Sequence, residues 1–136
     1  MKRTVALIVS ICCILGITSV VLVRKALEET EPIHISLLTL IANREKYDGK
    51  LVRVEGVACF YFEGHGIHWS KEAFDHNFDD IALDDENVPE ELRESWHELN
   101  GEYVTVEGVY EKDYEYTYSD LGGIMVTRCE KIKKYQ

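Results

Sequence analysis

The N-terminal segment constrains the chain most, because the twenty consecutive residues Thr4–Val23 carry no charge. A helix of this length rises roughly 30 Å, which is about the thickness of the hydrocarbon core of a bilayer. Basic residues flank the run on both sides, with Lys2 and Arg3 before it and Arg24 and Lys25 after it. The rest of the chain is too small to cover a uniformly apolar helix. The sequence therefore predicts an N-terminal transmembrane helix.

Three kinds of N-terminal segment share this general pattern. A cleaved signal peptide has a shorter apolar region, of about 7–15 residues, and a small-residue cleavage site that is not evident here. A lipoprotein signal needs a small residue before the modified cysteine, but Ile11 precedes Cys12. The sequence thus favours an uncleaved single-pass anchor within residues 1–27, with the membrane as its partner. The flanking charges and the free N-terminus slightly favour an extracytoplasmic domain on a bacterial cytoplasmic membrane.

The net charge of the chain, −10, averages two different parts. Every acidic residue lies at or after Glu28, and from there onward 11 basic and 25 acidic side chains give a net charge of −14. Proteins that bind the phosphate backbone of nucleic acids use an excess of Lys and Arg. Nucleic acid is therefore disfavoured as a partner of this part of the chain.

The remaining sequence has the pattern of a small, mainly β domain. Residues 28–35 form an acidic linker that contains Pro32, and the domain itself takes up residues 36–136. Ser36 caps a short helix that ends at about Asn43. Alternating apolar and polar residues predict strands at 50–62 and 102–112, and shorter apolar or mixed segments predict strands at 67–70, 81–83 and 124–133. A helix from about Pro89 to Leu99 separates the third predicted strand from the fourth.

An internal repeat connects two of these strands. DGKLVRVEGV at 48–57 resembles NGEYVTVEGV at 100–109, with an offset of 52 residues. Gly56 and Gly108 interrupt the alternation at the same position of each copy, and we expect a bulge or a sharp bend there.

Three strands, a helix and two strands is the element order of the oligonucleotide/oligosaccharide-binding (OB) fold, a five-stranded Greek-key barrel. From Ser36 to Ile132 the chain resembles small bacterial OB-fold proteins that are membrane-anchored or exported. The residues that carry the resemblance are YDGKLVRVEGV at 47–57, which look like the strand opening of such barrels. The resemblance implies an OB-like barrel, and it implies a fold more than an activity.

Two groups of residues are candidates for metal or disulfide chemistry. His65, His68 and His76, with Asp75, Asp79 and Asp80 nearby, have the ligand types of a transition-metal site. Their alternative role is that of exposed loop residues on an acidic surface. Cys59 and Cys129 lie in the acidic part, and export would permit a disulfide between them.

Aromatic residues form the candidate face for a ligand or a protein partner. The tyrosines of this face lie in the segment YEKDYEYTYSD, which joins the last two predicted strands, and in the first strand. Tyrosine can stack on sugars or anchor a protein, and the alternative is a hairpin with tyrosines packed across it. The residues of this face are Tyr61, Trp69, Tyr110, Tyr114, Tyr116 and Tyr118.

No sequence motif of catalysis or cofactor binding is present, so the sequence predicts a protein that is not an enzyme and has no cofactor. The leading hypothesis is a membrane-tethered binding module that contacts a protein or a small polar ligand. An alternative is extracytoplasmic metal or haem handling, because membrane-tethered OB-fold haem chaperones of cytochrome c maturation are similar in architecture. Their functional histidine lies in a His-x-x-x-Tyr motif near the end of the barrel, but no histidine follows His97 here. Nucleic-acid binding is the third hypothesis, and the acidity opposes it.

Overall fold

The structure is a computed structural model that describes residues 31–61, 64–115 and 119–133. These residues are mainly β. The strands are β1 (Ile33–His34), β2 (Leu51–Tyr61), β3 (Gly64–His68), β4 (Ile81–Asp84), β5 (Tyr103–Glu111) and β6 (Gly123–Lys131). The helices are α2 (Leu37–Ala42), α3 (Arg44–Tyr47), α4 (Lys71–Asp75), α5 (Glu90–Trp96) and the 3-10 helix η1 (His97–Leu99).

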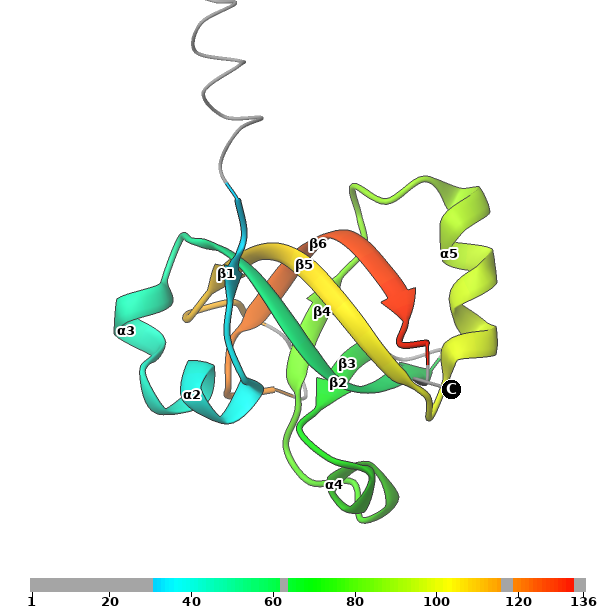
Figure 1. Ribbon diagram of the computed structural model, residues 1–136, viewed down its shortest axis with the longest axis horizontal. Helices are drawn as coiled ribbons and strands as arrows, with labels where there is room; N and C mark the ends of the chain where they lie inside the picture. The colour runs from blue at the N-terminus through cyan, green and yellow to red at the C-terminus, as the bar shows by residue number, and fades with distance from the viewer. Residues whose placement is uncertain (1–30, 62–63, 116–118, 134–136) are drawn as a thin grey trace, which may run out of the picture. The chain divides into compact units, whose positions relative to one another are not determined.

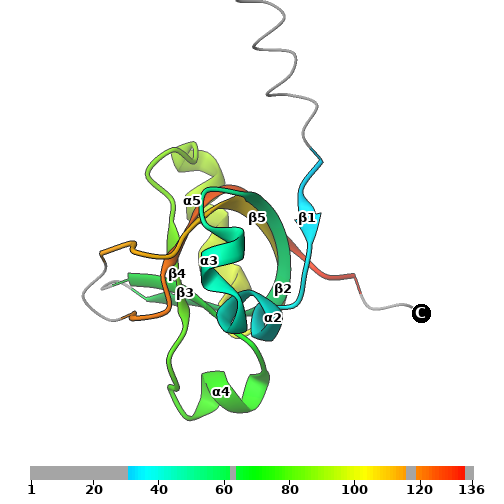
Figure 2. The ribbon, with the colours of Figure 1, turned by 90° about the vertical axis from the view of Figure 1, so that its left-hand side faces the viewer.

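Five of the six strands close into a ring (Figure 1). β2 pairs antiparallel with β3, and β3 pairs antiparallel with β4. β4 pairs parallel with β6, β6 pairs antiparallel with β5, and β5 returns to pair antiparallel with β2. Figure 2 shows β2 and β5 curving around the interior of this ring. The ring order is therefore β2-β3-β4-β6-β5, within a mixed sheet.

The internal repeat lies where β5 closes the ring against β2. Val54 lies opposite Val106, which occupies the same position in the other copy of the repeat. Each glycine of the repeat lies opposite a valine of the other copy, in the pairs Gly56–Val104 and Gly108–Val52. The two copies are therefore related by an approximate two-fold axis through the Val54–Val106 pair, which gives the sequence repeat a structural meaning.

The two repeat glycines allow neighbouring backbone to approach closely. A Cβ at Gly56 would lie 2.5 Å from the carbonyl oxygen of His68, and one at Gly108 would overlap the carbonyl oxygen of Met125. The pairing of β5 with β6 shifts by one residue beside Gly108, which leaves Thr127 without an opposite residue. The pairing of β2 with β5 continues past Gly56 without a shift, so a bulge occurs at only one of the two glycines.

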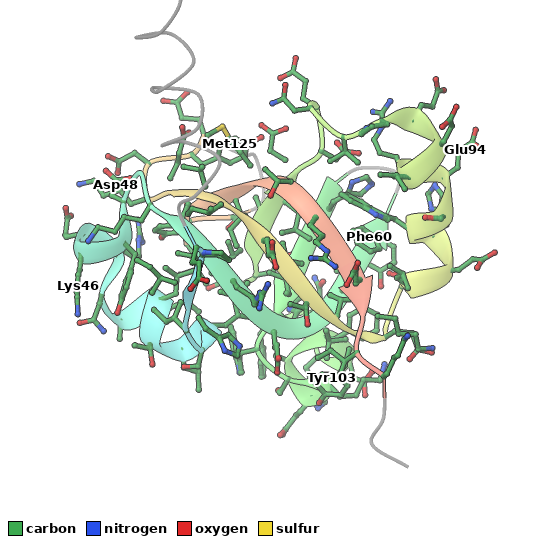
Figure 3. All side chains as sticks on the ribbon, turned by 45° about the horizontal axis from the view of Figure 1, so that its top comes forward. Lys46, Asp48, Phe60, Glu94, Tyr103 and Met125 are labelled. Atoms are coloured by element: carbon green, nitrogen blue, oxygen red, sulfur yellow. The ribbon has the colours of Figure 1, made fainter. Side chains whose placement is uncertain are left out.

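Short helices lie at the two ends of the ring, with α2 and α3 at one end and α5 at the other (Figures 1 and 2). Leu40 of α2 and Trp96 of α5 belong to the same buried apolar cluster as the valines of β2 and β5. Phe60 stacks on Trp96 with 5.2 Å between ring centroids. Figure 3 shows Phe60 on the side of the ring toward α5, whereas Lys46 lies on α3 at the opposite end. The interior is thus an apolar core that α2, α3 and α5 complete.

β1 is the one described strand outside the ring. Its residues Ile33 and His34 pair parallel with Val52 and Arg53 of β2, and the amide of Ile35 donates a 3.1 Å hydrogen bond to the carbonyl oxygen of Arg53. The sequence predicts a linker here, because two residues are too few to show alternation. In the structure they pair with the edge of β2 opposite to β5, ahead of the residues Val57–Tyr61 that pair with β3 on that edge.

The element order predicted for residues 36–136 is confirmed, and most boundaries agree within a few residues. The largest difference is at β3, which begins at Gly64 rather than at 67, because glycines at 64 and 66 gave this strand the appearance of a loop. Helix α3 was not predicted at all. Over the residues that the structure describes, no helix is both long and apolar enough to cross a membrane. The predicted anchor Thr4–Val23 lies outside those residues.

Candidate metal-binding site

Three potential metal ligands meet on the outside of the ring, and we refer to Cys59, His68 and Asp80 as the Cys–His–Asp cluster. Cys59 lies near the end of β2, His68 is the last residue of β3, and Asp80 directly precedes β4. One ligand atom from each side chain lies within 4.8 Å of the others. Sulfur, imidazole nitrogen and carboxylate oxygen are the three donor types that zinc accepts from proteins.

The strand register explains why these side chains share one face. Val57 pairs with His68, and Cys59 lies two residues after Val57, so Cys59 and His68 project on the same side of the sheet. Gly66 lies opposite both Cys59 and Ala82, and Asp80 lies two residues before Ala82. All three ligands therefore project outward from three adjacent strands or their ends.

Gly66 makes space at the centre of the Cys–His–Asp cluster. A Cβ at this position would overlap the carboxylate of Asp80, and its nearest contacts would all be with the Asp80 side chain. The absence of a side chain at Gly66 thus lets the Asp80 carboxylate lie across β3 beside His68. The same glycine that makes β3 look like a loop in the sequence allows the cluster to form.

Burial makes the unsatisfied state of His68 energetically significant. His68 is only 1% exposed, and neither of its ring nitrogens has a hydrogen-bond partner among the described residues. Its Nε2 lies 3.9 Å from Oδ2 of Asp80, too far for a hydrogen bond. A buried polar group without a partner costs about 1–3 kcal/mol. A ligand that bonds to the imidazole would remove this cost.

Burial also shifts the protonation of the three ligands. It raises the pKa of the Cys59 thiol from 9.0 to about 11, and the Asp80 carboxylate contributes to this rise. It raises the pKa of Asp80 from 3.8 to about 6, where the charge of Asp79 adds to the rise and a backbone hydrogen bond opposes it. Burial lowers the pKa of His68. At neutral pH the cluster therefore holds a thiol, a neutral imidazole and a carboxylate.

These protonation states distinguish between two possible chemistries of the cluster. A cysteine nucleophile needs a lowered pKa, which comes from a nearby positive charge or a helix N-terminus. The pKa of Cys59 is raised, and its charged neighbour Asp80 is acidic. A bound divalent cation would supply the missing positive charge and displace the thiol proton. The arrangement therefore suits metal binding better than unassisted nucleophilic catalysis.

Helix α4 and the chain segment before β6 border the cluster. α4 packs against β2 and β3, and the ring of Phe74 meets that of His68 edge to face at 5.7 Å. The hydroxyl of Ser119 donates a 2.5 Å hydrogen bond to the backbone oxygen of Asp80. The side chain of Asp80 remains 21% exposed. The cluster is therefore enclosed beside His68 and open to solvent beside Asp80.

The predicted histidine site is wrong as a group of three, since the structure places only His68 in a potential metal site. His65 projects into the ring, where its Nδ1 lies 3.4 Å from Oδ2 of Asp85 and its ring meets Phe60 edge to face. His76 is exposed beside Phe78. His65 and His68 lie three residues apart on one strand and so face opposite sides of the sheet.

The two cysteines are free thiols and also face opposite sides of the sheet. Cys129 lies opposite Val106 on β6 and packs against the interior core, whereas Cys59 faces outward. The register places Cys129 level with Val54, five residues from Cys59 and two strands away. This separation far exceeds the distance of about 4.4–6.8 Å between Cα atoms in a disulfide. The disulfide that the sequence allowed is therefore not formed.

The predicted aromatic face is only partly exposed. Tyr110 was assigned to it incorrectly, because Tyr110 is fully buried in the core and its hydroxyl donates a 2.7 Å hydrogen bond to the carbonyl oxygen of Leu121. Trp69 is partly buried and stacks on Phe78, while Tyr61 is 50% exposed. Tyr114 is partly buried and lies against Gly123. Tyr116 and Tyr118 lie outside the described residues.

A comparison with known proteins finds no matching family model and no matching curated relative. The function must therefore be inferred from the residues of the site.

Proposed function

We propose that the ring is an OB-type Greek-key barrel that binds a transition-metal ion at the Cys–His–Asp cluster, without catalysing a reaction. The ring order, the parallel pairing of β4 with β6 and the position of α5 between β4 and β5 support the OB assignment. The proposal includes attachment to a bacterial cytoplasmic membrane through Thr4–Val23, with the barrel on the extracytoplasmic side. The apolar run and its flanking charges support this attachment.

The observation that carries the metal proposal is His68, which is buried with both ring nitrogens unpartnered beside a thiol and a carboxylate. Buried polar groups in native proteins almost always have partners. A metal ion bound at the cluster would be a partner for the imidazole, and it would engage the thiol and the carboxylate at the same time. The proposal departs from the prediction that the protein has no cofactor.

The donor set favours zinc among common metal ions. Calcium and magnesium prefer oxygen ligands throughout, whereas a thiolate and an imidazole suit zinc and its neighbours in the transition series. Cobalt(II) accepts the same tetrahedral sites and is coloured, which makes it a useful probe.

The test is zinc binding by the full-length chain in detergent, measured by isothermal titration calorimetry and by metal analysis after dialysis. We expect one zinc ion per chain, and we expect His68→Gln to remove the binding. His76→Gln is the matched control, because His76 is exposed and outside the cluster. Absence of stoichiometric zinc binding by the unmodified protein, or equal binding by the His68→Gln variant, would overturn the proposal.

Contact with a protein partner is the second candidate function. Tyr61 at the end of β2 is 50% exposed, and Phe78 is 52% exposed although it stacks on Trp69. Exposed aromatic side chains are enriched at protein interfaces. Crosslinking in intact cells should yield one reproducible product that Tyr61→Ala and Phe78→Ala together abolish, and a product unchanged by both substitutions would contradict this function.

A further inference from the structure

The number of protein ligands at the Cys–His–Asp cluster has a direct chemical meaning. Structural zinc sites use four protein ligands, whereas sites with three leave a position for water or an outside molecule. Among the described residues, the cluster contains three candidate ligands and no fourth cysteine, histidine or carboxylate atom within the same distance. The hydroxyl of Ser119, which lies beside Asp80, is engaged with the backbone oxygens of Asp80 and Gly122.

The exposure of the three ligands shows where a fourth ligand can enter. Cys59 and His68 are 5% and 1% exposed, while the Asp80 side chain is 21% exposed. Phe74 covers the ring of His68 from α4. Solvent therefore reaches the cluster from the side of Asp80, and an outside ligand can approach the metal from that side.

Charge determines which outside ligand fits. A thiolate from Cys59 and a carboxylate from Asp80 together cancel the two positive charges of the ion, and His68 is neutral when it binds a metal. Asp79 directly precedes Asp80 in the chain and is exposed, so it adds a further negative charge beside the opening. An incoming anion would be repelled, whereas a neutral nitrogen donor would not.

We infer that the metal held by the Cys–His–Asp cluster keeps one exchangeable coordination position, open on the side of Asp80, which takes a neutral nitrogen donor of the imidazole type in preference to an anion. This inference rests on the metal-binding function proposed above. A histidine side chain of another molecule has the required chemistry. The site then differs from a structural zinc site in that its fourth ligand can exchange.

The experiment uses the full-length chain in detergent, loaded with cobalt(II) and titrated with imidazole or with thiocyanate. Absorption bands of cobalt report changes in its coordination, and filtration after each titration confirms that the cobalt stays bound. We expect imidazole to change the spectrum at concentrations at least about tenfold lower than thiocyanate requires. The Asp79→Asn variant should narrow this difference, because it removes a negative charge without removing a ligand.

Each outcome distinguishes the inference from the function on which it rests. Failure of the chain to bind cobalt or zinc would overturn the metal-binding function itself. A cobalt protein whose spectrum responds to neither probe has a closed coordination shell, which overturns the inference and leaves metal binding standing. A response to thiocyanate at equal or lower concentration than to imidazole would overturn the preference for a neutral donor.

Discussion

The two sides of the sheet are both buried around β2 and β3, yet their chemistry differs. Inside the ring, the buried hydroxyl of Tyr110 has a partner, the carbonyl oxygen of Leu121. Outside, beneath α4, His68 is equally buried and has none. The interior therefore contributes stability, whereas the outer side keeps a group whose bonding capacity is free for a ligand.

The two cysteines differ in role because a shift of one residue in β6 turns Cys129 toward the core, whereas Cys59 faces outward. The unpaired Thr127 shifts the alternation along β6, so that Arg128 faces outward and Cys129 faces the core. Without this shift Cys129 would share the outward face. Cys59, on β2, lies outward beside two other ligands. The same side chain is thus a packing residue in one place and a candidate ligand in the other.

The largest expected effect on stability is that of a Gly→Ala substitution on the inner side of the ring, compared with one on the outer side. Gly108→Ala would force a Cβ against the backbone of β6, and we expect it to lower the free energy of unfolding by about 3 kcal/mol. Gly66→Ala would displace only the Asp80 carboxylate, so it should abolish zinc binding and change stability little. Urea unfolding followed by tryptophan fluorescence measures the stability of the two variants, since both tryptophans lie in this domain. Similar stability losses in the two variants would contradict the comparison.

Zinc should stabilise the protein through one cysteine only. At a free zinc concentration of 100 times the dissociation constant, the gain in unfolding free energy is about 2.7 kcal/mol. Cys59→Ala should lose this gain, whereas Cys129→Ala should keep it, because Cys129 packs against the core. Thermal unfolding of each variant with and without zinc tests this. Retention of the zinc effect in the Cys59→Ala variant would show that the thiol is not a ligand.

At alkaline pH the burial of the Cys129 thiol should make stability depend on pH. Burial, with a contribution from Glu130, raises the pKa of Cys129 from 9.0 to about 12. Between these values the unfolded chain loses the thiol proton and the folded chain keeps it, so stability falls as pH rises, by about 1.4 kcal/mol per pH unit. Cys129→Ala should remove that part of the slope in urea titrations between pH 9 and 11. An unchanged slope would mean that Cys129 is accessible to solvent.

The smallest expected effect concerns the metal-free protein. Replacing the unpartnered His68 with leucine should raise the unfolding free energy by about 1 kcal/mol while removing zinc binding. His65→Leu is the matched control, and it should lower stability because His65 interacts with Asp85 and Phe60. Chemical denaturation in the presence of a chelator measures both changes. A loss of stability in the His68→Leu variant would indicate a structural role for the imidazole.

Much of the fold could be predicted from local pattern. Alternating valines gave β2 and β5 within about a residue, and apolar spacing up to Trp96 gave α5. These signals are local, because each depends on one face of one element meeting the core. The glycines at 64 and 66 hid the start of β3, since glycine carries no side chain to show alternation.

The site could not be predicted because it depends on register between strands. Cys59 and His68 share a face only through the pairing of β2 with β3, and Asp80 joins them only through β4. The sequence places Asp80 near His68 as a potential ligand, but it associates Cys59 only with Cys129, so the thiol is the ligand that sequence reasoning missed. Had β3 been recognised from Gly64, the parity of a hairpin between β2 and β3 would have placed Cys59 and His68 together.

The approximate two-fold relation between β2 and β5 also makes segment 48–57 complementary to a second copy of itself. In such a pair Val54 would lie opposite Val54 of the other copy. Arg53 would lie opposite Glu55 on either side of it, so that an apolar pair is flanked by two pairs of opposite charge. Two incompletely folded chains can therefore associate through this strand. Residues 58–102 tether β5 near β2 and favour closure within one chain, so association between molecules should increase with protein concentration during refolding.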